Sequence, residues 1–309
     1  IRGHWQTIVP ALFRRIPLLT EERERLELDD GDFLDLQWHR TGSDRLVILS
    51  HGLEGSANAS YIQGMARAFA KRGWDVLAWN CRSCSGEMNR LLRFYHSGVS
   101  DDLRRVVDHA LSTHSADKIA LIGFSLGGNL TLKYLGEEGK GVSPRLAGAV
   151  AFSVPCDLAS SSQRLGTWLN QRLYMQRFIK TLVQKLRLKS AEFPGEIDLS
   201  GINKVKTFKQ FDDRFTAPLH GFTSAEDYWE KASSRPYLPL IQVPTLLVQA
   251  RNDPFLAPAC FPEAEAQANS NFHLEVTESG GHVGFGGGSA SENWAEARAV
   301  RFLESLGDL

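Results

Sequence analysis

Short apolar runs alternate along the chain with segments of helical periodicity, and this alternation limits the fold more than any other feature of the sequence. Nearly continuous apolar runs rich in β-branched residues are typical of a parallel sheet covered by helices on both faces. The expected strands span residues 44–52, 74–80, 118–124, 146–155, 244–253 and 272–278. The expected helices span residues 61–72, 100–114, 126–138 and 291–306, the last with Ser291 as its N-cap. The sequence therefore predicts an α/β fold with a mostly parallel central sheet.

Two stretches depart from this alternation. Residues 25–40 read as a hairpin around Asp30-Gly31, which adds an antiparallel edge to the sheet. Between about residues 156 and 236 the chain has helical patterns but no strong strand, and this stretch is too long for a plain loop. We interpret it as a helical cap inserted into a single domain that spans residues 1–309. Such a cap would lie over the carboxyl ends of the strands, where open α/β sheets bind ligands.

Composition excludes several classes of function. The chain carries 35 Lys and Arg against 36 Asp and Glu, so no global basic field attracts nucleic acid, and we expect no such partner. No apolar run approaches the roughly 18 residues of a membrane span and no secretory signal is visible, which favours a cytoplasmic protein. Cys81 and Cys84 form a C-x-x-C, but Cys156 and Cys260 stand far apart, so free thiols are favoured over a zinc or redox site.

The segment 118–135 joins a predicted strand to a predicted helix through Gly-Phe-Ser-Leu-Gly. A serine flanked by Gly123 and Gly127 at such a turn is typical of a nucleophile elbow, in which the turn raises the hydroxyl above the sheet. The same glycines would also serve an ordinary tight turn, so the motif alone leaves both interpretations open. If Ser125 is a nucleophile, the N-terminal N–H groups of the following helix point at the oxyanion it would form.

A serine nucleophile needs a general base and a carboxylate that orients this base. In hydrolases with this elbow the chain order is Ser, then Asp or Glu, then His, which leaves His220, His273 and His282. His220 lies in the expected cap and His273 inside a strand, whereas His282 follows the last strand in a glycine-rich loop and is the predicted base. The candidate acids are Asp157, Asp198, Asp212, Asp213, Asp227 and Asp253. Asp253 alone directly follows a convincing core strand, and we expect it to orient His282.

The loop that follows the first parallel strand has the sequence His51-Gly-Leu-Glu-Gly55. A loop in this position usually supplies the second backbone N–H of an oxyanion hole, so we assign the donors to the amides of Leu53 and Leu126. His51 precedes Ser125 in the chain and is expected to be structural rather than catalytic. Triad chemistry requires no cofactor and no metal ion, and no Cys/His cluster in the sequence suggests one.

With these residues placed, the chain resembles the α/β-hydrolase superfamily over almost its whole length, and more closely the YheT-like (AB hydrolase 4) family. The matching segments are GHWQTIVPAL, HGLEGS, NCRSCSGEMNRLLRFYHSG, GFSLGGNLTLKYLGE, FDDRFTAPLHGFTSAEDYW, ARNDPF and GGHVGF. The resemblance implies the α/β-hydrolase fold, a triad of Ser125, Asp253 and His282, and acyl or lipid-like esters as substrates. One departure is Ser83, where the family often has glycine.

The predicted function is therefore a serine hydrolase that cleaves carboxylic esters through an acyl-enzyme. An acyltransferase or a peptidase on the same fold is the alternative, because nothing in the sequence separates transfer to water from transfer to another acceptor. A further alternative is a binding protein that keeps the fold without catalytic activity. We expect a small acyl ester or lipid as substrate and infer no obligate protein partner.

Residues 163–189 of the expected cap contain no acidic residue and carry apolar side chains at helical spacing. The seven basic residues of this segment are Arg164, Arg172, Arg177, Lys180, Lys185, Arg187 and Lys189. This pattern suggests contact with a lipid or anionic membrane interface. The alternative is a set of cap helices that pack on the core and leave a solvated basic face.

Overall fold

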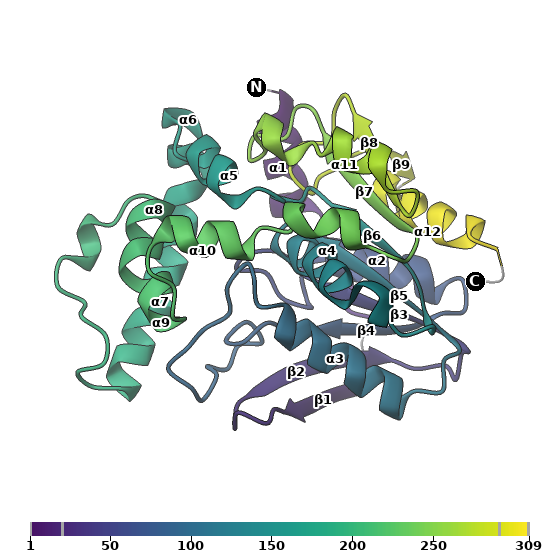
Figure 1. Cartoon of the computed structure of the whole chain (residues 1–309), viewed down its shortest axis with the longest axis horizontal. Helices are drawn as coiled ribbons and strands as arrows, with labels where there is room; N and C mark the ends of the chain where they lie inside the picture. The colour runs from purple at the N-terminus through teal and green to yellow at the C-terminus, as the bar shows by residue number, and fades with distance from the viewer. Residues whose placement is uncertain (1, 20–21, 290–291, 308–309) are drawn as a thin grey trace.

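A computed structural model describes residues 2–19, 22–289 and 292–307 of the chain (Figure 1). Within these ranges the chain folds around a sheet of eight strands in the order β1-β2-β4-β3-β5-β6-β7-β8. Strands β3 to β8 pair parallel, whereas β1 and β2 form an antiparallel hairpin that joins the edge at β4. The strands are β1 Glu22–Glu27, β2 Phe33–His39, β3 Arg45–Ser50, β4 Asp75–Trp79, β5 Lys118–Phe124, β6 Leu146–Phe152, β7 Thr245–Ala250 and β8 Phe272–Thr277. The predicted α/β fold and the hairpin are confirmed.

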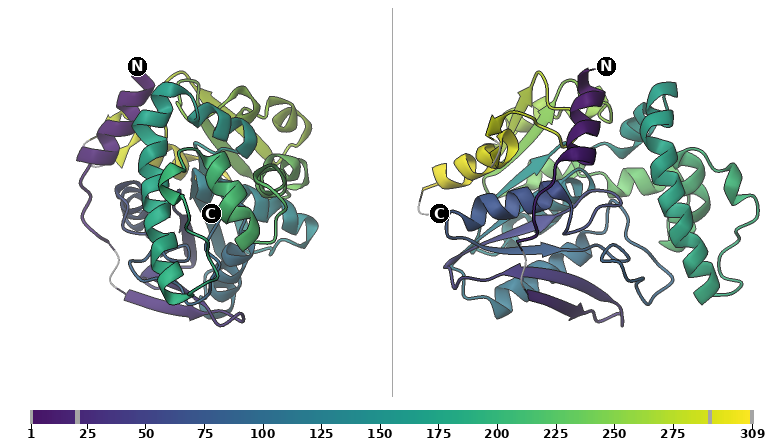
Figure 2. Two further views of the ribbon diagram at one scale, coloured as in Figure 1. Left: turned by 90° about the vertical axis from the view of Figure 1, so that its left-hand side faces the viewer. Right: turned by 180° about the vertical axis from the view of Figure 1, so that it is seen from behind.

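The central strands are buried on both faces, which explains why their sequences are apolar at nearly every position. In β5, Ile119 and Leu121 pack with helices on one face, while Ala120 and Ile122 pack with helices on the other. The first face is covered by α3 (Ser100–Thr113) and α4 (Leu126–Glu138). The second is covered by α2 (Ser60–Ala70) and α12 (Trp294–Ser305), which lie together in Figure 2. The protein therefore has three layers, with the sheet in the middle.

Two helices were not expected from the sequence, and one N-cap differs. These are α1 (Arg2–Phe13) and α11 (Glu263–Ala268), whose own sequences show no clear helical pattern. Helix α12 is capped by the side chain of Asn293, which accepts from the N–H of Glu296, so the expected N-cap is wrong. The residue expected there, Ser291, lies outside the described residues. A short ladder of β9 (Gly288–Ser289) and β10 (Glu292–Asn293) precedes this helix.

Between β6 and β7 the described chain is helical and forms no strand. The helices are α5 Leu158–Leu165, α6 Trp168–Asn170, α7 Gln176–Glu192, α8 Phe208–Phe211, α9 Ala217–Leu219 and α10 Ala225–Ala232. Short stretches of 3-10 helix span Gly139–Gly141, Ile202–Lys204, Arg235–Leu240 and Pro258–Cys260, and π-helical turns span Gln171–Met175 and Asp212–Thr216. Helices α5 to α10 gather on the left of Figure 1, beyond one end of the sheet.

These helices build an apolar cluster of their own. Met175, Ile179 and Leu186, which recur at helical spacing in the sequence, are buried in it together with Phe211 and Phe215. The cluster reaches the body of the protein through Phe94 and Phe255. None of the helices in the described ranges combines the length and apolar character that crossing a bilayer requires.

Candidate active site

Ser125 lies at a strained turn between β5 and α4. Its backbone has φ 52° and ψ −117°, a conformation that residues with a side chain rarely adopt. A Cβ on Gly123 would lie 2.4 Å from the carbonyl oxygen of Gly127, and a Cβ on Gly127 would lie 2.3 Å from that of Ser50. The two glycines therefore let strand and helix approach closely enough to form the turn. The N–H of Ser125 donates to the carbonyl of Phe152 at 2.8 Å, which fixes the turn to strand β6.

The structure brings Ser125, Asp253 and His282 together in one chain of hydrogen bonds. His282 Nε2 lies 2.9 Å from Ser125 Oγ, and His282 Nδ1 lies 2.9 Å from Asp253 Oδ2. Asp253 is buried, and its other carboxylate oxygen accepts from the N–H of Phe255 at 2.8 Å. Because the carboxylate can only accept, the imidazole proton belongs on Nδ1, and Nε2 is then free to accept from the serine.

Helix α1 holds the loop that carries His282. Thr7 Oγ1 accepts from the N–H of His282 at 2.8 Å and donates to the carbonyl of Gly3 at 2.8 Å. A Cβ on Gly284 would lie 2.0 Å from the carbonyl oxygen of Gln6, so the loop touches the helix backbone directly. Asn252, which precedes Asp253, donates to Gln6 Oε1 at 2.7 Å. The segment GHWQT therefore fixes both the His282 loop and the Asp253 loop.

Two further side chains contact the His282 loop. The ring of Phe255 stacks on the imidazole with centroids 3.9 Å apart and an interplanar angle of 17°. Ser153 follows strand β6, and its hydroxyl accepts from the N–H of Val283 at 2.9 Å. Neither contact was predicted from the sequence. The only signal was the position of both residues just beyond strands that end at this edge of the sheet.

The loop His51 to Gly55 lies against the nucleophile, since a Cβ on Gly52 would be 3.2 Å from Ser125 Cβ. Three of its amides have acceptors: Gly52 N–H donates to Tyr61 Oη at 3.0 Å, Glu54 N–H to Tyr95 Oη at 2.8 Å, and Gly55 N–H to the Gly52 carbonyl at 3.0 Å. The Leu53 amide has no acceptor among the described residues. Leu126 is the first residue of α4, where amides have no partner within the helix. Both amides and Ser125 belong to residues that line one cavity.

His51 fixes this loop rather than facing the substrate. Its Nδ1 lies 2.7 Å from the carbonyl of Gly52, and its Nε2 accepts from the N–H of Cys81 at 3.1 Å. Complete burial lowers the pKa of His51 to about 4, so the ring is neutral near pH 7. A neutral ring with Nδ1 protonated satisfies both contacts, which agrees with the structural role expected for His51.

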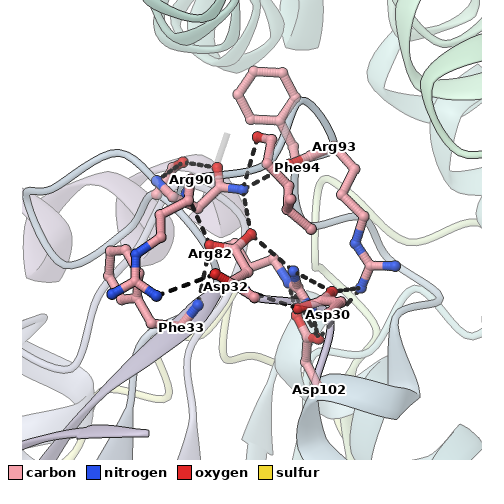
Figure 3. A network of polar contacts seen from close by, with 12 residues as sticks. Asp30, Asp32, Phe33, Arg82, Arg90, Arg93, Phe94 and Asp102 are labelled. Atoms are coloured by element: carbon pink, nitrogen blue, oxygen red, sulfur yellow. Dashed lines mark hydrogen bonds and ion pairs between the residues drawn. The ribbon is translucent and has the colours of Figure 1, made fainter. Parts of the chain in front are cut away.

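A buried network of ion pairs holds the loop of residues 81–97 in place (Figure 3). Arg82 lies at its centre and pairs with Asp30, Asp32 and Asp102, each at 2.8 Å. Asn89 Nδ2 donates to Asp32 Oδ2 at 2.7 Å, so the network reaches the middle of the loop. The network joins the β1–β2 turn and the start of α3 to the loop that carries Tyr95.

The C-x-x-C segment is part of the same loop and is buried. Burial raises the pKa of the Cys84 thiol to about 11 and that of Cys81 well above its usual value, so both are protonated near neutral pH. Ser83, between them, has a positive φ of 62°, which explains why glycine is favoured at this position. Its hydroxyl offsets part of the strain by donating to Asn89 Oδ1 at 2.6 Å.

A cavity of about 600 Å³ opens beside Ser125 and His282. Residues of α1, the His51 loop, α5, α7 and the turn Asp212–Thr216 line it, so helices between β6 and β7 form part of its wall. Most of its side chains are apolar, including Ile8, Leu12, Phe94, Leu158, Phe178 and Phe215. A cavity of this size is typical of a site for a small organic ligand.

The basic segment 163–189 is only partly a solvated face. Lys189 is fully buried, and Lys185 reaches into the cavity and pairs with Glu54 at 2.7 Å. By contrast, the indole of Trp168 is 69% exposed. The seven basic residues therefore do not form one continuous surface.

Comparison with known proteins identifies the fold and the family of the chain. A family model described as the alpha/beta hydrolase fold matches residues 45–288. The chain is 37% identical to the putative esterase YheT of Escherichia coli (strain K12), over 97% of this chain and 89% of that protein. It is 29% identical to the phospholipase ABHD3 of Homo sapiens, over 92% of this chain and 71% of that protein.

A solved structure, the esterase Pf2001 of Pyrococcus furiosus, superposes with a TM-score of 0.63 at 20% identity and covers 93% of this chain and 91% of that one. This likeness shows the fold. The expectation of a hydrolytic enzyme agrees with the names of the relatives. The chain therefore belongs to the α/β-hydrolase fold family and, within it, to the YheT-like family.

Proposed function

We propose that the protein is a serine hydrolase that cleaves carboxylic esters of lipid-like substrates through a covalent acyl-enzyme. The observation that carries the proposal is the contact of 2.9 Å between Ser125 Oγ and His282 Nε2, with Asp253 on the other side of the imidazole. The esterase and phospholipase names of the relatives support the same reaction class.

The first half of the reaction transfers the acyl group to Ser125. His282 Nε2 takes the hydroxyl proton while Oγ attacks the ester carbonyl carbon. The carbonyl oxygen gains negative charge and accepts from the amides of Leu53 and Leu126. When the tetrahedral intermediate collapses, the bond to the alcohol oxygen breaks and His282 returns the proton to that oxygen. The alcohol leaves, and the acyl group stays on Ser125.

The second half repeats these steps with water. His282 takes a proton from a water molecule, whose oxygen attacks the acyl carbon. The same two amides stabilise the second oxyanion. Its collapse breaks the bond between the acyl carbon and Ser125 Oγ, and His282 returns the proton to Oγ. The carboxylate of Asp253 stabilises the imidazolium that forms at each attack. The products are one carboxylic acid and a free enzyme.

The cavity favours substrates with a long apolar part. Its lining is largely aliphatic and aromatic, so an acyl chain placed there would be removed from water at about 0.8 kcal/mol per methylene. We further propose that residues of about 156–236 act as a cap over the site within one domain. An acyltransferase or a peptidase remains the alternative, because the same acyl-enzyme could be resolved by another acceptor.

We also propose a contact with lipid surfaces, at the mouth of the cavity. Leu12 and Leu173 both line the cavity and are exposed, at 45% and 40%, so the apolar lining continues onto the surface. Trp5, Phe13 and Trp168 on the same two segments are exposed at 63%, 72% and 69%. We call these five residues the apolar rim. Its two sides meet where His4 Nδ1 lies 3.0 Å from Tyr174 Oη.

The function is tested by labelling with a fluorophosphonate and by hydrolysis of p-nitrophenyl esters of increasing chain length. Ser125→Ala should lose labelling and about 10⁶ in kcat, His282→Ala nearly as much, and Asp253→Asn should retain more activity. Ser112→Ala is the matched control, because Ser112 is exposed at the end of α3. Unimpaired ester hydrolysis by Ser125→Ala would falsify the proposal. Ester cleavage that needs an added acyl acceptor, or preference for anilides, would favour the alternatives.

A further inference from the structure

Glu54 directly follows Leu53 and has a backbone that needs external support. Its φ is 54°, in the left-handed region that favours glycine, although it carries a long charged side chain. The support comes from Tyr95, whose hydroxyl accepts from the Glu54 N–H at 2.8 Å and donates to Glu54 Oε1 at 2.7 Å. One side chain therefore holds both the backbone and the carboxylate of Glu54.

The same carboxylate oxygen also binds a lysine from a distant helix. Lys185 of α7 donates to Glu54 Oε1 at 2.7 Å. Its ammonium also lies 3.3 Å from Cys84 Sγ and 5.2 Å from the centre of the Tyr95 ring. The side chains of Lys185 and Glu54 are only 18% and 9% exposed, so water screens their charges weakly.

This arrangement bears on the oxyanion that the proposed reaction forms. The Leu53 amide would bind the oxyanion, and the neighbouring residue places a carboxylate in the same cavity. A lone carboxylate there would repel the developing negative charge, and the repulsion is strong where water is largely excluded. The ammonium of Lys185 cancels the charge of the carboxylate and also ties the loop to α7.

We propose that Lys185, Glu54 and Tyr95 are positioning residues for the oxyanion hole. Tyr95 and Glu54 set the direction of the Leu53 amide. Lys185 removes the electrostatic cost of having Glu54 there and makes a competent oxyanion hole depend on the docking of α7. The inference rests on the proposed function, because it concerns the oxyanion of that reaction.

The test compares Lys185→Met, Glu54→Gln and the double variant Lys185→Met/Glu54→Gln on p-nitrophenyl butyrate. Lys185→Met should lower kcat by tenfold or more with little change in KM, since it leaves an uncompensated carboxylate that is felt in the transition state. Glu54→Gln should lose less of the kcat, because glutamine still accepts from the Tyr95 hydroxyl and the charge that remains, on Lys185, is positive. The double variant should therefore be faster than Lys185→Met alone. The rate of fluorophosphonate labelling should follow the same order.

Two variants serve as controls. Lys185→Arg keeps the charge and should retain most of the kcat. Arg187→Met makes the same kind of change two residues along α7, where the guanidinium contacts Asn203 outside the cavity, and should leave kcat unchanged. If Lys185→Met does not fold, Tyr95→Phe tests the same loop, and it should lower kcat by about tenfold, with a stable fold and a nearly constant KM.

A kcat for Lys185→Met equal to that of the unaltered protein would overturn the inference. So would a double variant no faster than Lys185→Met, because the uncompensated carboxylate of Glu54 would then not be the cause of the lost rate. Where Lys185→Met cannot be purified, an unchanged kcat in Tyr95→Phe would overturn the inference instead. Failure of the proposed function is recognised separately, since it shows as activity that survives Ser125→Ala.

Discussion

At the scale of single residues, the site depends on backbone conformations that are unfavourable in isolation. Ser125, Ser153 and Glu54 all have positive φ values, between 52° and 54°, and each lies within the site. A non-glycine residue in such a conformation costs of the order of 1–2 kcal/mol, so neighbouring contacts must hold it. For Ser125 these contacts include the hydrogen bond to Phe152 and the close approach of two glycine-flanked segments. The strain is offset by the fold around it, and it exposes the hydroxyl.

Thr7 supplies a prediction at this scale. Thr7→Val keeps the shape of the side chain but removes the acceptor for the His282 N–H, which costs about 1–3 kcal/mol when a partly buried donor is left unpaired. The loop can recover this energy only by moving, which takes the imidazole away from Ser125. We expect a lower melting temperature and a kcat reduced by about tenfold or more, with a smaller change in KM. Thermal unfolding and ester hydrolysis measure both effects.

The control for this prediction is Thr7→Ser, which keeps the hydroxyl and removes only a methyl group. It should be close to the unaltered protein in kcat. If Thr7→Val and Thr7→Ser had the same kcat, the hydrogen bond to His282 would have no part in positioning the base.

That Ser125, Asp253 and His282 lie together could be predicted because each follows a strand and their order in the chain is restricted. The residues that hold them could not. Thr7 is 275 positions from His282 in sequence, and nothing local to either residue indicates their contact. The same holds for Lys185 and Glu54, separated by 131 positions. Chain order limits which residues react, whereas the supporting contacts follow only from the three-dimensional fold.

At the scale of helices and strands, prediction succeeded where burial leaves a periodic pattern. Strands β5 and β8 were found within one residue at each end, because nearly every position of β5 is buried and the sequence of β8 alternates apolar and polar residues. Helix α1 was missed because only Gly3 and Thr7 among its residues are buried, and neither is a large apolar residue. Helix α11 buries none of its residues, so its sequence carries no stripe that faces a core. An amphipathic pattern predicts a helix only if the helix packs by large apolar side chains.

The buried carboxyl group of Asp212, in the π-helical turn Asp212–Thr216, should make the stability of the protein depend on pH. Its carboxylate accepts from Thr216 Oγ1 at 2.6 Å and from Trp229 Nε1 at 2.8 Å, and burial raises its pKa to about 7. The folded protein therefore holds a proton that the unfolded chain, with a pKa of 3.8, has lost. The resulting stabilisation is complete below about pH 4 and disappears as the pH rises through about 7.

The measurement is the free energy of unfolding in urea at pH 5 and pH 8. From pH 5 to pH 8 the free energy of unfolding of the unaltered protein should fall by about 2–3 kcal/mol more than that of Asp212→Asn, because the amide does not titrate. Asp213→Asn is the matched control. The carboxylate of Asp213 is exposed and has a lowered pKa, so its titration causes no loss of stability between pH 5 and pH 8. Equal slopes for the unaltered protein and Asp212→Asn would show that the folded carboxyl is ionised at pH 5.

At the scale of the whole molecule, the cavity is formed by segments from most of the chain. It is lined by α1 at the N-terminus, the His51 loop, helices between β6 and β7, and the His282 loop near the C-terminus. Figures 1 and 2 show α1 beside the upper end of the helices that follow β6, and residues of both line the cavity. The sequence indicated an insertion over the strand ends but not this contribution, because α1 buries only Gly3 and Thr7 and so carries no apolar stripe that signals a helix.

The apolar rim leads to a prediction for the whole molecule. Three of its side chains, Trp5, Phe13 and Trp168, are largely exposed, and exposed Trp and Phe side chains favour the boundary between water and acyl chains. Replacing all three by alanine should weaken binding to phosphatidylcholine vesicles and lower hydrolysis of a long-chain ester presented in them by about tenfold or more. Hydrolysis of dissolved p-nitrophenyl acetate should not change, because the triad is untouched.

The control for the rim is Leu240→Ala, which removes a side chain that is 51% exposed and does not line the cavity. Vesicles with phosphatidylglycerol added separate two causes of binding. If the basic residues of the segment 163–189 dominate, the added negative charge should strengthen binding in the unaltered protein and in the rim variant alike, and the effect should fade with salt. If the rim dominates, the variant should bind both kinds of vesicle weakly. Vesicle binding and long-chain activity that survive the triple replacement would place substrate entry elsewhere on the molecule.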